Sequence, residues 1–278
     1  MREMTHTGTI ALSNDQLMHH APSIFATAPH HEVSDRYGFQ PTIDVVDALR
    51  FEGWMPVDAT QKNVRDKSKR DLTTHLLRFR RLDDEVMIGD SVAELVLKNS
   101  HDRSSAFVLH AGVFRMACAN GIIIADSTLQ KMSVRHGKNI VGEIIEGSYE
   151  VMDEIPMLAD HVCGMQATDL SPAEREIFAH TAYTFAHGER TENDLTSEGN
   201  IINQMLRPKR HSDTGNDLWT TFNVIQENLI RGGIKTMKLN DKGRPKRSTK
   251  RAVNNVDKSI KLNKALWEMA TSMKAIKG

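Results

Sequence analysis

The residues most able to do chemistry in this sequence are His101 and Asp102, which have serines on both sides. An imidazole oriented by a carboxylate can act as a general base toward a serine hydroxyl. Catalytic groups of this kind usually come from separate elements, because neighbours in one loop rarely reach the required geometry. The alternative is a turn whose polar side chains satisfy its own backbone. We therefore expect Asn99, His101 and Asp102 to form a turn or a ligand-contacting loop.

Cys118 is a second candidate, as a nucleophile with His101 or His110 as its base. It lies among apolar and small residues, where a cysteine more often serves as a small buried hydrophobe. Nothing in the sequence around it predicts the depressed pKa that a reactive thiol needs. An enzyme centred on His101, Asp102 and Cys118 is therefore kept as an alternative.

Basic residues form the third group of candidates. The segment from Lys235 to Arg251 holds eight lysines and arginines against the single acid Asp241. Side chains of this kind can follow a phosphate backbone, although a basic loop is often only solvated. Arg115 interrupts an apolar run, where it could pair with an internal carboxylate or reach a phosphate. The residues expected to contact nucleic acid are Arg78, Arg80, Arg81, Arg103, Arg115, Lys242, Arg244, Lys246 and Arg247.

Other functional motifs are missing. The glycines form neither a phosphate-binding loop nor a dinucleotide fingerprint, and the acids do not form a recognisable two-metal pattern. The two cysteines, Cys118 and Cys163, lack the spacing of metal ligands. The paired histidines near the start are adjacent in sequence and so point to different sides of an element. We expect no metal and no cofactor.

Composition limits the class of protein. The chain has 278 residues, of which 39% are hydrophobic and 26% are charged, so it can build a substantial core. Its 36 basic and 36 acidic residues exclude a uniformly basic nucleic-acid binder but leave room for local patches. The sequence contains neither a run of about 18 apolar residues nor a signal peptide at its start. These features favour a cytoplasmic protein that does not act in a membrane.

The elements that must position these residues change in character along the chain. Alternating patterns and short apolar runs predict strands at 54–64, 73–82, 93–98, 105–110, 122–125 and 129–135. Within 73–82, Arg78 and Arg80 should share the face opposite Leu77 and Phe79. Helical spacing and capping residues predict helices at 42–52, 113–119, 141–155, 171–187, 217–231 and 258–276. The order predicts an α+β fold, with an antiparallel sheet in the N-terminal half packed by helices and a helical C-terminal half.

Four segments follow from these patterns. Residues 1–36 form a polar N-terminal segment, and residues 37–233 form an α+β core domain with a helical second half. Residues 234–257 form a basic flexible loop, because Gly243 and Pro245 disfavour regular structure. Residues 258–278 form a helix that packs on the core or on another copy, so that a homo-oligomer is possible. We find no internal repeat.

Several of these segments also resemble a known family. The motifs are Asn99-Ser100-His101-Asp102-x-Ser104-Ser105, Gly112-x-Phe114-Arg115-x-x-Cys118-x-Asn120-Gly121, Glu146-Gly147-Ser148-Tyr149-Glu150-Val151 and Asn216-Asp217-Leu218-Trp219-Thr220-Thr221. They resemble the domain of unknown function 932 family, and most closely its enterobacterial prophage and plasmid branch. Arg103 stands where the family pattern usually has glycine. The resemblance implies a mobile-element origin and no known activity.

The leading hypothesis is a non-enzymatic protein that binds single-stranded DNA and acts in mobile-element DNA maintenance or recombination. Few aromatic residues are available to stack bases, since they make up only 5% of the chain. The first alternative is an anti-defence factor that binds and inhibits a host restriction or immunity protein. The second is the enzyme centred on His101, Asp102 and Cys118.

Overall fold

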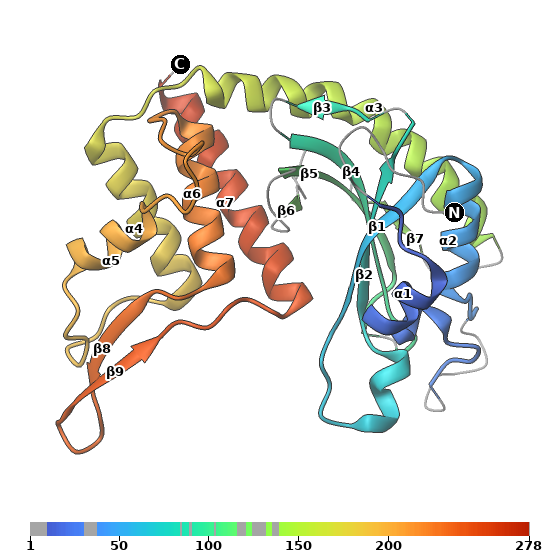
Figure 1. The fold of residues 1–278 in the computed structure, drawn as a ribbon, viewed down its shortest axis with the longest axis horizontal. Helices are drawn as coiled ribbons and strands as arrows, with labels where there is room; N and C mark the ends of the chain where they lie inside the picture. Colours follow the sequence, from blue (N-terminus) through green and yellow to red (C-terminus); the bar gives the residue numbers. More distant parts are fainter. Residues whose placement is uncertain are drawn as a thin grey trace. The chain divides into compact units, whose positions relative to one another are not determined.

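The computed structural model divides the chain into two compact units, residues 1–159 and 160–278 (Figure 1). It describes residues 10–30, 38–83, 85–88, 91–102, 104–115, 121–123, 132–134 and 139–277. The core domain expected at 37–233 therefore contributes to both units, which are described separately.

Unit 1 is built on an antiparallel sheet. Its strands are β1 (Trp54–Gln61), β2 (His75–Arg81), β3 (Met87–Ile88), β4 (Ser91–Asn99), β5 (Phe107–Arg115), β6 (Gly121–Ile123) and β7 (Met132–Val134). The main order is β1-β2-β4-β5-β6, with β3 paired to β4 and β7 paired to β5. Every pairing among these described strands is antiparallel. The predicted α+β class and the antiparallel sheet of the N-terminal half are confirmed.

Helices pack beside this sheet. They are α1 (Asn14–His20), the short 3-10 helices η1 (Pro22–Phe25) and η2 (Lys67–Leu72), α2 (Thr42–Phe51) and α3 (Ile140–Gln166), which crosses the boundary between the units. Helix α2 lies against β1 and buries Val45, Val46 and Leu49. The Tyr149 hydroxyl of α3 donates a hydrogen bond to Glu52 at the end of α2. Helix α2 thus adds apolar side chains to the core of unit 1.

The helix predicted at 113–119 is wrong where the structure describes it. Strand β5 continues to Arg115 and pairs with β4 on one side and with β6 and β7 on the other. Residues 107–113 are all buried, so both faces of the strand are apolar and its run cannot be told from a helix by period. Residues 116–120 lie outside the described residues.

Unit 2 is mainly helical. Besides the end of α3 it contains α4 (Pro172–His187), α5 (Glu198–Met205), α6 (Leu218–Arg231) and α7 (Val256–Lys277). The capping box predicted at Ser171 is present, and Asp217 caps α6. Trp267 of α7 is 1% exposed and meets the Phe222 ring of α6 at 6.3 Å. Helix α7 thus packs on its own chain, and this unit confirms the predicted helical C-terminal half.

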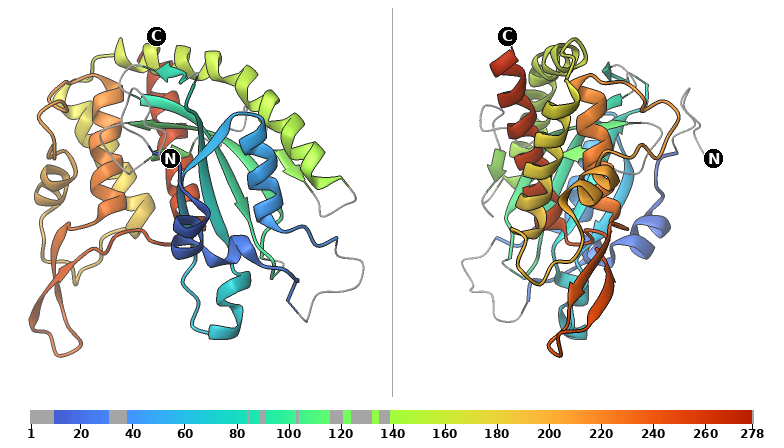
Figure 2. Two further views of the ribbon diagram at one scale, coloured as in Figure 1. Left: turned by 45° about the vertical axis from the view of Figure 1, so that its right-hand side comes forward. Right: turned by 90° about the vertical axis from the view of Figure 1, so that its left-hand side faces the viewer.

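The basic flexible loop expected at 234–257 contains a β-hairpin, formed by β8 (Lys235–Leu239) and β9 (Pro245–Thr249). Figures 1 and 2 show it extending from the helices of its unit. Gly243 adopts φ +68° in the turn, which suits glycine, and Pro245 opens β9, where a strand tolerates proline. The two residues that argued against regular structure are therefore the ones that shape the turn.

None of the helices in the described part of the chain combines the length and the apolar content that crossing a membrane requires.

Candidate functional site

The loop that contains His101 and Asp102 joins β4 to β5 and folds on its own side chains. The backbone amide and hydroxyl of Ser104 both donate to the Asp102 carboxylate. Ser100 accepts from the Ser105 amide at 2.7 Å and donates to the Ser105 carbonyl at 3.1 Å. The polar residues of this loop thus act on the backbone, as in a turn.

Asn99 and His101 belong to a buried network centred on Thr42, the first residue of α2. The Thr42 hydroxyl lies 2.9 Å from His75 Nε2 and 3.0 Å from His101 Nε2, and it accepts from Asn99 Nδ2 at 2.9 Å. On its other side, His75 Nδ1 lies 2.9 Å from the Ser23 hydroxyl. We call these five side chains the Thr42 network. All of them are 0% exposed.

The donors and acceptors of the Thr42 network can be assigned from the groups at its ends. His75 Nδ1 faces the Thr73 carbonyl, which can only accept, so this nitrogen carries the hydrogen. Nε2 of His75 is then an acceptor and receives the Thr42 hydroxyl hydrogen. Since Thr42 also accepts from Asn99, its remaining lone pair takes the hydrogen of His101 Nε2. Burial lowers the pKa of His75 to about 4, which agrees with the neutral ring that this order requires.

This geometry bears on the predicted ligand loop and on the enzyme alternative. Every hydrogen-bonding position of Thr42 is used inside the protein, and the two histidines are oriented by it. The network ties η1, α2, β2 and the end of β4 together, which is a structural role. Cys118 lies outside the described residues, so its relation to His101 is not defined.

Arg78 and Arg80 share one face of β2, as predicted, and both side chains are buried. They are 8% and 4% exposed. Glu94 of β4, itself 1% exposed, binds Arg78 Nε at 2.6 Å and Arg80 Nη2 at 2.6 Å. The residues expected to grip nucleic acid here are instead paired with a buried carboxylate that the antiparallel register brings beside them.

The other predicted arginines of unit 1 add no described phosphate surface. The Arg81 guanidinium lies 6.0 Å from the centre of the Trp54 ring. Arg115 is the last residue of β5, where its backbone pairs with Ser91. Its side chain is not described, and Arg103 lies outside the described residues. These basic residues and the hairpin of unit 2 belong to different units.

The hairpin of unit 2 carries the exposed charge. We call four of its residues the hairpin cations: Lys242, Arg244, Lys246 and Arg247. All four are exposed, and within the described residues none of them forms an ion pair. Lys238, by contrast, is bound to Asp194 at 3.5 Å. The hairpin cations are therefore available to an anion outside the protein.

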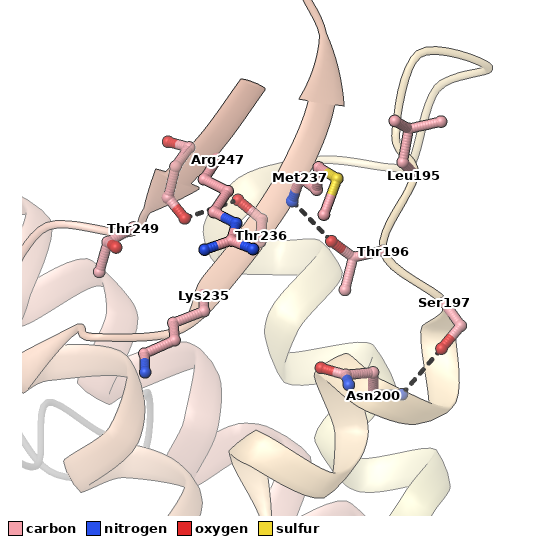
Figure 3. Close-up of a pocket in the computed structure, with 10 residues that line it drawn as sticks. Leu195, Thr196, Ser197, Asn200, Lys235, Thr236, Met237, Arg247 and Thr249 are labelled. Atoms are coloured by element: carbon pink, nitrogen blue, oxygen red, sulfur yellow. Dashed lines mark hydrogen bonds between the residues drawn. The ribbon is translucent and has the colours of Figure 1, made fainter. Parts of the chain in front are cut away.

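The base of the hairpin is held in place along the outer edge of β8. The Met237 amide donates to the Thr196 hydroxyl at 2.7 Å (Figure 3), and the Leu195 amide donates to the Met237 carbonyl at 2.8 Å. Gln204 of α5 exchanges two hydrogen bonds with the backbone of Lys235, at 2.8 and 3.0 Å. The hairpin therefore projects from a fixed platform.

A pocket of about 570 Å³ lies where the hairpin meets this platform. Its lining is Leu195, Thr196, Ser197, Asn200, Lys235, Thr236, Met237, Arg247, Ser248 and Thr249 (Figure 3). Arg247 lies opposite Met237, so it shares a face of the hairpin with Lys235. No lining residue is acidic, and all of them except Leu195 and Met237 offer hydroxyl, amide or cationic groups. We call this the first pocket.

A second pocket, of about 830 Å³, shares Asn200 and Lys235 with the first. It brings in two basic residues that sequence reasoning missed, Arg207 and Lys209. A signal for them was available, because Arg-Pro-Lys-Arg occurs at 207–210 and again at 244–247.

Comparison with known proteins places the chain in a family. Residues 29–267 match the model described as a domain of unknown function (DUF932). Two proteins of Escherichia coli (strain K12), UPF0380 protein YafZ and UPF0380 protein YfjQ, are each 38% identical over 262 residues. Each alignment covers 94% of this chain and 91% of the relative. No solved structure gives a significant match. The motifs around Asn99–Gly121, the matched range and these relatives show that the chain belongs to the DUF932 family.

Proposed function

We propose that this protein binds single-stranded DNA through the β8–β9 hairpin and the first pocket, without catalysing a reaction. The observation that carries the proposal is the first pocket itself. The basic hairpin forms one side of this pocket, and no acidic residue lines it. A cleft lined by one sign of charge concentrates ligands of the opposite sign. The resemblance to a prophage and plasmid branch supports a role in DNA maintenance or recombination of a mobile element, within the cytoplasm.

In this proposal the hairpin cations contact phosphates. Their side chains stand on both faces of the hairpin and around its turn, because residues alternate along β9. Arginine and lysine neutralise phosphate and release the counterions condensed on it, which makes binding sensitive to salt. Arg247 links the two parts of the site, since it is both a hairpin cation and a wall of the first pocket.

The first pocket favours a single strand over a duplex. Its volume falls within the range of about 300–1,000 Å³ that small-ligand pockets usually have, so it can take one nucleotide unit. Bases of a single strand can turn away from their neighbours and enter such a pocket, whereas those of a duplex are stacked inside the helix. The exposed hydroxyl groups of Ser248 and Thr249 can then bond to a base edge or a sugar.

Fluorescence anisotropy with a labelled oligothymidylate, measured from low to moderate salt, tests the proposal. A duplex and an RNA of equal length should bind more weakly than the DNA single strand. Replacing both Arg244 and Arg247 with glutamine removes two phosphate contacts, so the slope of log affinity against log salt should fall by about 1.4. The Lys258→Gln/Lys261→Gln variant changes the net charge equally, at exposed positions of α7, and should keep the slope of the unchanged protein.

Absence of binding at low salt would refute the proposal. An equal loss of affinity in the hairpin variant and the α7 control would also refute it, because binding would then depend on overall charge and not on the hairpin. Tighter binding of the RNA would mean that the hairpin and the first pocket bind single-stranded RNA and not DNA.

A further inference from the structure

We infer that Arg207 and Lys209 form a second phosphate-binding site, which holds the same single strand as the first pocket. The inference rests on the proposed function and deepens it, because it makes the ligand an oligomer long enough to occupy both pockets. The second pocket has a volume of about 830 Å³ and places Arg207 and Lys209 beside Lys235. No acidic residue lines it.

The backbone at Arg207 is held by α6. Asn228, which is 5% exposed, donates through Nδ2 to the carbonyls of Met205 at 2.9 Å and Arg207 at 3.0 Å. A side-chain amide that bridges the end of a helix to the following residues fixes their direction. The segment that follows α5 therefore presents Arg207, Pro208 and Lys209 to solvent, and all three are exposed.

The carboxylate whose charge acts on Lys209 is that of Glu227, and two arginines already bind it. Glu227 is 3% exposed and binds Arg210 Nη2 at 3.1 Å and Arg231 Nε at 3.2 Å. Arg210 and Arg231 thus share the single negative charge of Glu227. Partial burial lowers the pKa of Lys209, and a bound phosphate would stabilise its charged form again. The second pocket is therefore suited to an anion.

The two pockets form one path. Asn200 and Lys235 line both of them. The paired hydrogen bonds between Gln204 and the Lys235 backbone join the end of α5 to the start of β8. Arg207 follows Leu206, the residue that caps the end of α5, and β9 pairs with β8 along its length. A strand that leaves the first pocket past Lys235 is thus led toward Arg207 and Lys209 by fixed elements.

The repeated tetrapeptide supplies the same chemistry at the two ends of this path. Arg207 and Lys209 come from the first Arg-Pro-Lys-Arg, and Arg247 comes from the second. The two copies place different residues in the pockets. The last arginine of the second copy, Arg247, lines the first pocket, whereas the last arginine of the first copy, Arg210, binds Glu227. Two phosphate sites joined by one ligand bind it more tightly than either does alone.

The test measures the affinity for oligothymidylates of increasing length, in the whole protein and in an Arg207→Gln/Lys209→Gln variant. The affinity of the unchanged protein should rise steeply once an oligomer reaches the second pocket. The variant should lose roughly tenfold or more for long oligomers, should bind the shortest ones normally, and should lose about 1.4 from the salt slope. The Lys258→Gln/Lys261→Gln variant should match the unchanged protein at every length, and equal melting temperatures would show that all three chains are folded.

Three results would overturn the inference. If the unchanged protein binds and the Arg207→Gln/Lys209→Gln variant matches the control at every length, the second site fails while the proposed function stands. If the loss is equal for short and long oligomers, the two sites are not joined by one strand. If no oligomer binds the unchanged protein, both the proposed function and this inference fail.

Discussion

Replacing Thr42 with valine removes the hydroxyl at the centre of the buried network and almost nothing else. Valine has nearly the same shape, so the substitution opens no cavity. The lost hydroxyl makes three hydrogen bonds of 2.9–3.0 Å, to His75, His101 and Asn99. Each buried partner left without its bond costs about 1–3 kcal/mol. The substitution should therefore lower the free energy of unfolding of unit 1 by roughly 3–9 kcal/mol, a large share of the ~5–15 kcal/mol of a typical domain.

Thr42→Ser is the matched control. It keeps the hydroxyl and removes one buried methyl group, so it should cost only about 1 kcal/mol. Amide hydrogen exchange read on peptides from β2 and β4 reports unit 1 separately from unit 2, and urea unfolding reports the whole chain. If Thr42→Val and Thr42→Ser agree within ~1 kcal/mol, the hydrogen bonds assigned to Thr42 contribute little and the reasoning is wrong.

Three further predictions concern stability. Glu94→Gln should lower the free energy of unfolding by about 3 kcal/mol in urea titrations, because the two buried arginines lose their shared carboxylate. The pKa of His75 falls from its ordinary value of 6.5 to about 4 on folding, so its contribution is complete above pH 6.5 and is lost as the pH falls toward 4. Unfolding free energies at pH 7 and pH 4.5 should differ by roughly 2–3 kcal/mol more in the unchanged protein than in His75→Gln. Gly232→Ala should lower the melting temperature more than Gly188→Ala, since both glycines have positive φ but only the first would put its Cβ 2.6 Å from backbone atoms. Equal losses at the two glycines would contradict the close approach that the structure places at Gly232.

Local signals in the sequence predict the elements whose ends are set by neighbouring residues. Ser171 with Glu174 marks a capping box, and Asp217 caps the helix that Gly232 ends. The alternation in β2 correctly placed Arg78 and Arg80 on one face. Such features depend on residues within a few positions of one another, which a single sequence displays.

Whether the two arginines on that face are paired with a carboxylate depends on the register between β2 and β4. Glu94 reaches Arg80 only because β4 lies beside β2 in one antiparallel alignment, and no local pattern fixes that alignment. The end of β5 is missed for a related reason, since residues 107–113 are all buried and their apolar run is therefore uniform. Tertiary pairing decided both outcomes.

The sequence predicts only part of the candidate site. The hairpin cations were identified from charge alone, but the first pocket needs Asn200 and Lys235 from elements far apart in the chain. Arg207 and Lys209 could have been noticed from the repeated tetrapeptide. Their place on the same path as Arg247 became apparent only from the two pockets that share Asn200 and Lys235.

Lysine footprinting tests the nucleic-acid interface most directly. The folded protein is acetylated with a short reagent pulse, with and without saturating oligothymidylate, and each lysine is quantified by mass spectrometry. The proposed path predicts protection of Lys209, Lys235, Lys242 and Lys246. Lys258 and Lys261 on the exposed surface of α7 should react equally in both samples. Protection of the α7 lysines, with the hairpin and Lys209 unchanged, would contradict the account.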